Sequence, residues 1–109
     1  MPDNTGQGPL TEAVYYILLA LHSPMHGYGI MQFVKEVSNE RVQLGPGTLY
    51  GALNTMQKKG WIKAIDGANT DRKKEYAITA EGKDAVRGEM ERLKELLGNG
   101  KKITGGMER

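Results

Sequence analysis

The sequence contains no cysteine, and this absence sets the first limits on its chemistry. Disulfides, thiolate catalysis and cysteine-ligated metal centres are excluded. A lack of disulfides is typical of a protein of the reducing cytoplasm. Histidine is nearly as scarce: His22 and His26 flank Pro24, and neither has an acidic or nucleophilic residue close in sequence. A helix cap or a supporting role suits these histidines better than a metal site. We therefore expect no metal, no cofactor and no enzymatic activity.

Long hydrophobic runs are missing as well. No stretch approaches the roughly 20 apolar residues that a membrane-spanning helix needs, so we expect no membrane partner. Residues 1–9 lack the basic start and the apolar stretch of a signal peptide. Because this segment is polar and contains Gly and Pro, we expect it to be disordered.

Neither sign of charge dominates, but the charge is unevenly distributed. The formal net charge is +2, with residues 1–44 carrying −2, residues 45–79 carrying +3, residues 80–97 carrying −1 and residues 98–109 carrying +2. The middle of the chain is therefore its electropositive part. An excess of this size is compatible with an ordinary solvated face as well as with an anionic partner.

Apolar spacing and capping residues divide the chain into helices and strands. Helices are expected where apolar residues recur every three or four positions, and strands where they alternate. Pro46 suits a first helical position, Gly60 suits a helix end and Thr79 suits an N-cap. The predicted order is helix 10–21, helix 27–37, helix 46–59, strand 61–65, strand 72–78 and helix 80–97, followed by a flexible basic tail over 99–109.

This order of elements is that of a winged helix-turn-helix with one added helix. The predicted fold class is mainly α with a small β-hairpin. Residues 10–79 would form the winged helix-turn-helix, and residues 80–98 would form a C-terminal dimerisation helix. In this architecture three helices share one core, and the hairpin covers its open edge.

The third helix carries the strongest candidate nucleic-acid surface. Its solvent-facing side contains no acidic residue and consists of Thr48, Tyr50, Gly51, Asn54, Thr55 and Lys58. Asn54 suits bidentate pairing with adenine in the major groove, which admits a helix with short, polar or cationic side chains. Gly51 costs a helix about 1 kcal/mol relative to alanine. Close approach to a DNA strand and tight packing against a neighbouring helix are both reasons to tolerate it.

The predicted hairpin carries three consecutive cations, Arg72, Lys73 and Lys74, beside its turn. A cationic tip on a two-stranded ribbon suits contact with phosphates or with the minor groove. A charged edge also blocks pairing between sheets, so the same cations have a purely protective explanation.

Two helices indicate a second subunit. Helix 10–21 is apolar on nearly all sides, and a helix of that kind is buried on nearly all sides. In the last helix, Val86, Met90, Leu93 and Leu97 form a short seam like that of a coiled coil. The acids of this helix, Asp84, Glu89, Glu91 and Glu95, are expected on its solvent side.

Three motifs in this order resemble the PadR family of bacterial and archaeal transcription regulators. They are His26-Gly27-Tyr28, then Gly45-Pro46-Gly47-Thr48-Leu49-Tyr50, then Arg72-Lys73-Lys74-Glu75-Tyr76-Ala77-Ile78-Thr79-Ala80-Glu81-Gly82. The resemblance covers about residues 10–97, and the Pro-Gly-Thr-Leu-Tyr segment is its most specific part. The chain is similar to the small subgroup of the family that has a single C-terminal helix.

The resemblance implies a cytoplasmic homodimer that binds double-stranded DNA and regulates transcription, usually as a repressor. It places Tyr28, Thr48 and Tyr50 at DNA-facing positions and makes the strand around Lys73 and Lys74 the wing. It also implies dimerisation through the first and last helices, which adds Val14, Tyr15 and Leu18 to the seam. A small hydrophobic or aromatic effector is typical of the family, and Tyr15 and Tyr16 are the candidates to line its site. The rival interpretations are a winged helix used only for protein interaction and a small-molecule sensor that does not bind DNA.

Overall fold

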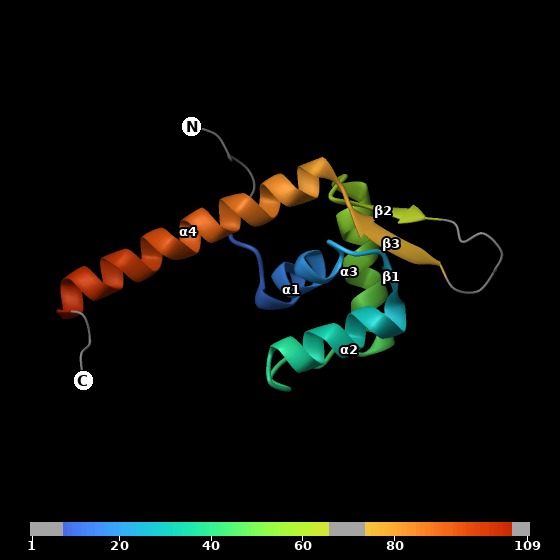
Figure 1. The fold of residues 1–109 in the computed structure, drawn as a ribbon, viewed down its shortest axis with the longest axis horizontal. Helices are drawn as coiled ribbons and strands as arrows, with labels where there is room; N and C mark the ends of the chain where they lie inside the picture. Colours follow the sequence, from blue (N-terminus) through green and yellow to red (C-terminus); the bar gives the residue numbers. More distant parts are fainter. Residues whose placement is uncertain (1–7, 66–73, 106–109) are drawn as a thin grey trace.

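A computed structural model describes residues 8–65 and 74–105 of the chain. Its elements, in chain order, are α1 (Glu12–Ala20), β1 (Met25–His26), α2 (Gly27–Val37), α3 (Pro46–Lys58), β2 (Ile62–Ile65), β3 (Glu75–Ile78) and α4 (Ala80–Thr104), as Figure 1 shows. The first three helices, the small sheet and the C-terminal helix confirm the predicted mainly α, winged-helix architecture.

Local capping explains where the helices begin and end. The side chain of Thr11 accepts a hydrogen bond from the backbone N–H of Val14 and so caps α1. At the other end of α1, Nδ1 of His22 lies 3.1 Å from the carbonyl oxygen of Leu18, which confirms the expected role of this histidine as a helix cap. Thr79 caps α4 through the N–H of Gly82, also as predicted.

The core lies where α1, α2 and α3 meet the sheet. Its fully buried members come mainly from one stripe of each helix: Ile17, Leu18, Leu21, Ile30, Val34, Leu49, Leu53 and Met56. Ile62, Tyr76 and Ile78 close it from the strands, and Val86 closes it from α4. Helices α2 and α3 each bury only one stripe and keep an exposed outward face, whereas in α1 every residue after Glu12 is at least partly buried.

The sheet has three antiparallel strands in the order β1-β3-β2, rather than the two of the predicted hairpin. The added strand, β1, pairs Met25 with Tyr76 and His26 with Glu75. A strand of two residues has no period of its own, so only its pairing with β3 defines it. Strand β3 begins at Glu75, and Arg72 and Lys73, the first two residues of the predicted strand 72–78, lie outside the described residues.

Helix α4 is longer than predicted, and its expected end at Leu97 is wrong. The helix continues through Gly98, Asn99 and Gly100 and ends at Thr104. It stops where Gly105 takes a left-handed conformation (φ 77°) and donates its N–H to the carbonyl of Lys101. The part of the predicted flexible tail over residues 99–104 is therefore helical.

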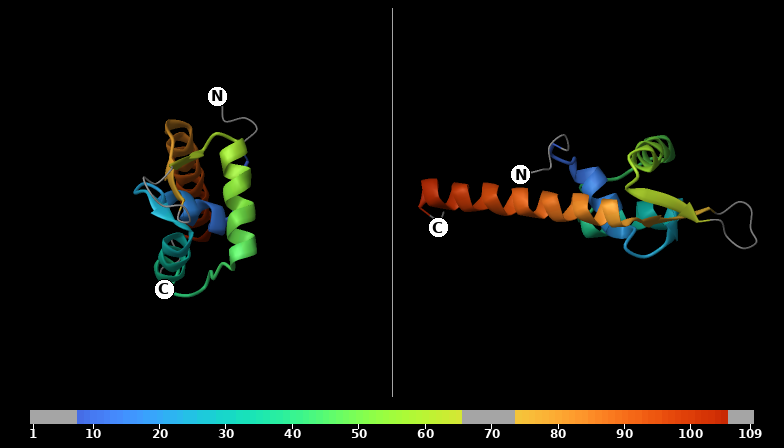
Figure 2. Two further views of the ribbon diagram at one scale, coloured as in Figure 1. Left: turned by 90° about the vertical axis from the view of Figure 1, so that its right-hand side faces the viewer. Right: turned by 90° about the horizontal axis from the view of Figure 1, so that it is seen from above.

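Two helices define the outside of the molecule. Helix α3 stands along one outer side, and α4 runs past α1 so that its last turns extend beyond the other elements (Figures 1 and 2). With 25 residues, α4 is about 37 Å long at 1.5 Å per residue. The first half of α4 packs on the core, whereas its second half extends beyond the other described elements.

Candidate nucleic-acid interface

The outward flank of α3 is the candidate interface. Gly45 is the N-cap and Pro46 occupies the first turn, as predicted, so the helix starts abruptly at the end of the connector from α2. Its inward stripe is buried, and its exposed flank consists of Gly47, Thr48, Tyr50, Gly51, Asn54, Thr55, Gln57 and Lys58. No residue of α3 is acidic. A polar, acid-free helix flank of this kind fits the major groove.

Gly51 has open space around it. Among the residues that the structure describes, a Cβ atom built on Gly51 would have no heavy atom within 4 Å, apart from its chain neighbours and the helix's own backbone. Tight packing against this part of the chain is therefore not the reason for a glycine here, although the sequence left it open as one of two explanations. The Thr55 hydroxyl donates to the carbonyl of Gly51 at 3.2 Å, so it is turned back onto the helix.

Tyr28 and Tyr50 lie at the junction of α2 with α3. A Cβ atom on Gly27 would collide with the hydroxyl end of Tyr50, so the tyrosine ring occupies the space that this buried glycine leaves free. Tyr28 follows Gly27 directly, and its side chain is 65% exposed. Tyr50 therefore positions α2 against α3, while Tyr28 is the more exposed of the two rings.

The wing joins this surface through β3. Burial, and then the neighbouring Tyr50, raise the pKa of the Tyr76 hydroxyl on β3. Lys74, directly before β3, is exposed, and Arg72 and Lys73 lie outside the described residues. The structure thus brings Tyr50 of α3 beside the strand that follows Lys74.

Two exposed polar residues, one on α3 and one on β2, are not among the predicted site residues. Gln57 extends the outward flank of α3, three residues after Asn54, and Lys63 is exposed on β2. The alternation within strand 61–65 is the signal that could have identified Lys63, because its neighbours Ile62 and Ala64 face the other side.

The expected dimer residues divide into two groups. Met90, Leu93 and Leu97 are 53%, 41% and 60% exposed on α4, and Val14 and Tyr15 are partly buried against the core. Leu18 and Val86, in contrast, are 0% and 5% exposed. Both belong to the core of the single chain, so their prediction as interface residues is contradicted. Leu96 and Ile103, which were not predicted, are 52% and 81% exposed.

The rings of Tyr15 and Tyr16 lie close together, with centroids 6.1 Å apart and planes tilted by 47°. Both side chains are half-buried. An apolar cavity of about 270 Å³ lies between α1 and α3 instead, and its lining includes Leu10, Val14, Met56 and Trp61. The two tyrosines are therefore neighbours, but they do not belong to the lining of this cavity.

Glu89 corrects a prediction. Its side chain is 3% exposed and not on the solvent side of α4. The carboxylate accepts the backbone N–H of Leu10 at 3.1 Å and pairs with the guanidinium of Arg92. The Arg92 hydrogen bond and the Leu10 N–H hold the pKa of Glu89 below its usual range, against the opposing effect of burial. This contact ties the segment before α1 to α4.

The described residues hold neither a membrane helix nor a metal cluster. Among residues 8–65 and 74–105, no helix combines the length and apolarity that crossing a bilayer requires. In the same ranges, no three histidine or carboxylate side chains come together as a metal site.

Three helices, a wing and an acid-free flank on the third helix define a winged-helix DNA-binding protein. The model of the transcriptional regulator PadR-like family matches residues 16–88. The chain therefore belongs to this family, whose members are regulators that bind DNA.

Individual proteins are similar to this chain in sequence or in fold. An uncharacterised 37.1 kDa protein in a transposon of Streptomyces fradiae is 32% identical over 88 residues, which are 80% of this chain and 24% of that protein. This chain thus spans about a quarter of that relative. A transcriptional regulator from Clostridium thermocellum has a similar structure, with a TM-score of 0.68, 25% identity, and coverage of 89% of this chain and 92% of the other. A PadR family regulator from Clostridium difficile shares the fold at TM-score 0.68 and 23% identity, covering 86% of this chain and 99% of the other.

Proposed function

We propose that this protein is a cytoplasmic homodimer that binds an inverted-repeat operator and represses the adjacent genes. In this proposal α3 enters the major groove, Asn54 and Thr48 contact base edges or phosphates, and Lys58 contacts the backbone. The observation that carries the proposal is the exposed, acid-free flank of α3. A flank with glycine at its centre lets the helix backbone approach the groove closely.

The dimer would form through α1 and α4. The exposed apolar side chains of α4 support this role, because large apolar side chains gathered on one exposed stripe favour burial against a partner. A two-fold dimer places its recognition helices about 34–36 Å apart, which is one turn of DNA. The two halves of the operator would therefore lie in successive major grooves on the same face of the duplex.

The wing would contact the phosphate backbone beside α3. Lys74 is exposed next to β3, and Arg72 and Lys73 precede it in the chain. Replacing Lys74 by alanine should weaken binding to all duplexes alike and flatten the log–log salt dependence by about 0.9 for one lost phosphate contact. Lys94→Ala, on the exposed second half of α4, is the matched control and should leave the slope unchanged.

Release by a small hydrophobic or aromatic effector completes the proposal. Tyr15 and Tyr16 lie on α1, the helix that would meet the partner subunit, so a ligand between the subunits would contact these rings. Such a ligand would change operator affinity by favouring one arrangement of the two α3 helices over another.

The experiment that tests the function is selection of genomic fragments by the purified protein, followed by footprinting. Recovery of an inverted repeat with half-sites one helical turn apart is the expected result, and the neighbouring genes identify the targets. Should gel shifts at low salt detect no complex with any duplex, the DNA-binding role fails, and a protein-interaction or sensor role takes its place.

A further inference from the structure

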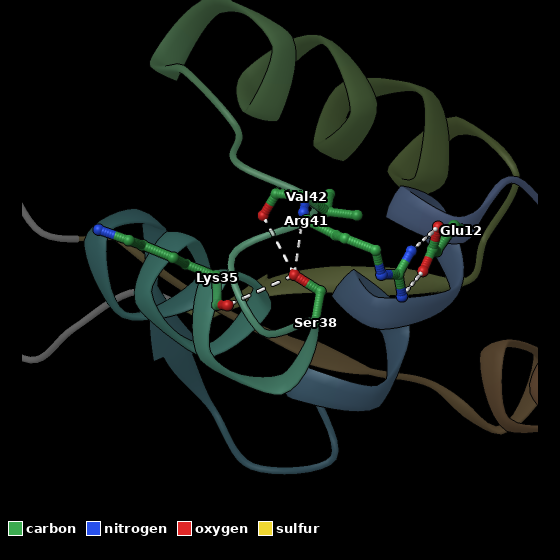
Figure 3. Close-up of polar contacts among 5 residues, drawn as sticks. All are labelled: Glu12, Lys35, Ser38, Arg41 and Val42. Atoms are coloured by element: carbon green, nitrogen blue, oxygen red, sulfur yellow. Dashed lines mark hydrogen bonds and ion pairs between the residues drawn. The ribbon is translucent and has the colours of Figure 1, made fainter.

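The connector between α2 and α3 is a fixed turn, not a loose loop. The hydroxyl of Ser38, a residue that is 1% exposed, accepts the backbone N–H of Val42 at 3.0 Å. It lies 3.4 Å from the carbonyl oxygens of both Lys35 and Val42, either of which can accept its proton (Figure 3). The Glu40 N–H closes the turn onto the carbonyl of Lys35 at 2.8 Å. The path of the chain out of α2 is therefore determined by α2 itself.

One side chain of this turn reaches a different helix. The guanidinium of Arg41 binds both carboxylate oxygens of Glu12, in the first turn of α1, with Nη1–Oε1 3.0 Å and Nη2–Oε2 2.5 Å (Figure 3). A two-point contact between a planar guanidinium and a carboxylate fixes orientation as well as distance. The Arg41 hydrogen bond lowers the pKa of Glu12, so the pair is ionised at neutral pH.

The turn leads into the recognition helix with little slack. After Val42, only Gln43, Leu44 and Gly45 precede α3, and Leu44 is anchored by packing on the core. The carbonyl of Gly45 already accepts the N–H of Leu49 at 2.9 Å. A shift of the turn at Arg41 would therefore have only three residues in which to be absorbed before the first turn of α3.

The first turn of α1 is held on its other side by α4. Leu10, two residues before Glu12, donates its N–H to the buried carboxylate of Glu89. The Glu89–Leu10 contact, the short chain segment from Leu10 to Glu12 and the Glu12–Arg41 ion pair thus link α4 to the connector. It joins the helix that would carry the dimer seam to the start of α3.

We propose that the Glu12–Arg41 ion pair positions the recognition helix, so that the placement of α1 and α4 determines how α3 meets the DNA bases. This inference rests on the proposed function. It adds a route by which the dimer interface affects how α3 recognises the operator sequence. Arg41 acts here through the connector, and it is not a DNA contact.

The test compares two duplexes: one selected from the genome by the unaltered protein, and a scrambled duplex of the same composition. Glu12→Gln and Arg41→Gln should each lower the affinity ratio between them by about three- to tenfold. Binding to the scrambled duplex should stay unchanged. The double variant should lose no more than either single variant, and the exchanged pair, Glu12→Arg with Arg41→Glu, should recover most of the ratio. Asp84→Asn removes another exposed ion pair, that with Arg87, and is the matched control.

A direct phosphate contact by Arg41 predicts a different pattern and would overturn the proposal. In that case Arg41→Gln weakens binding to both duplexes and flattens the salt dependence by about 0.9, whereas Glu12→Gln strengthens binding by freeing the cation. Unchanged ratios in both single variants would also overturn it.

A second readout separates this proposal from the DNA-binding role itself. In the free protein, both single variants should shift the amide NMR signals of Gly47, Thr48 and Tyr50 while thermal unfolding remains cooperative. If those signals do not move, the positioning role fails even when the unaltered protein binds its operator. If they move but no duplex binds, the proposed function fails and the link between α1 and α3 stands.

Discussion

Helices α3 and α4 both present an uncovered face, but the two faces have opposite chemistry. The flank of α3 is polar, contains two glycines and has no acidic residue. The uncovered face of α4 carries Leu93, Leu96 and Ile103, which are spaced three and then seven residues apart. The first surface fits a polyanion, and the second fits an apolar partner such as another copy of the chain.

The stripe on α4 continues the one that packs on the core. Gly82, Val86 and Glu89 are buried in its first half, and Leu93 follows Glu89 after four residues, in the 4-3 spacing of a coiled coil. The same face therefore serves the chain's own core first and is free for a partner afterwards. This continuity explains why sequence periodicity could not separate Val86 from Leu93: both lie on one stripe, and only the extent of the core divides them.

Leu93→Glu should have the largest effect on this comparison. A charge buried without a partner costs several kcal/mol, so the dimer dissociation constant should rise about a hundredfold or more. Sedimentation should show monomers at micromolar concentration, and operator binding should fall with them. Lys94→Glu places the same side chain on the polar side of α4 and should leave the dimer intact. An intact dimer in Leu93→Glu would place the interface elsewhere.

Asn54→Ala examines the polar face in the same way. A bidentate contact to a base contributes about 1–3 kcal/mol of discrimination, so affinity should fall about 5- to 150-fold for the cognate site only. Binding to sites altered at the base pair that Asn54 reads should stay the same, which a panel of single-base operator variants measures. Asn99→Ala, on α4, serves as the control. An equal loss for every sequence would show that Asn54 does not read a base.

Glu89 ties α4 to the segment before α1, and its loss should appear in the pH dependence of stability. The folded pKa of Glu89 is lower than its unfolded value of about 4.3. Its contribution is therefore fully present above about pH 5 and is lost as the pH falls through the folded pKa. Glu89→Gln should lower the free energy of unfolding by about 1–2 kcal/mol at pH 6 and by less at pH 3.

Urea unfolding at both pH values measures this difference. Glu91→Gln removes an exposed carboxylate of the same helix and should change neither value. If Glu89→Gln is destabilising to the same extent at pH 3 and pH 6, the ionised carboxylate is not what stabilises the contact.

The sequence predicts the elements whose signals are local. Pro46 and Gly60 bracket α3, and Thr79 begins α4, because caps depend on a few neighbouring residues. The candidate surface on α3 was predictable for the same reason, since an inward stripe determines which residues face outward.

Features that depend on distant residues were not predictable. Strand β1 exists only because Met25 pairs with Tyr76 across the sheet. Glu89 looks like an ordinary surface acid until the backbone N–H of Leu10, 79 positions away, is brought beside it. The end of α4 was misplaced because Gly98 and Gly100 each have a helix-breaking propensity, whereas the stop itself is the left-handed Gly105.

Gly51→Ala should give the smallest effect. It is informative because the expected changes in stability and in operator affinity have opposite signs. Because a Cβ here meets no neighbouring atom, alanine should stabilise the free protein by about 0.5–1 kcal/mol through helix propensity. If the α3 backbone approaches DNA at this point, the same methyl group should weaken operator binding severalfold. Gly100→Ala is the matched control: it is equally open and equally helical, but it lies on α4. Gly100→Ala should raise stability by a similar amount and leave DNA affinity unchanged. If Gly51→Ala binds the operator as tightly as the unaltered protein, or more tightly, α3 does not need this glycine to approach DNA.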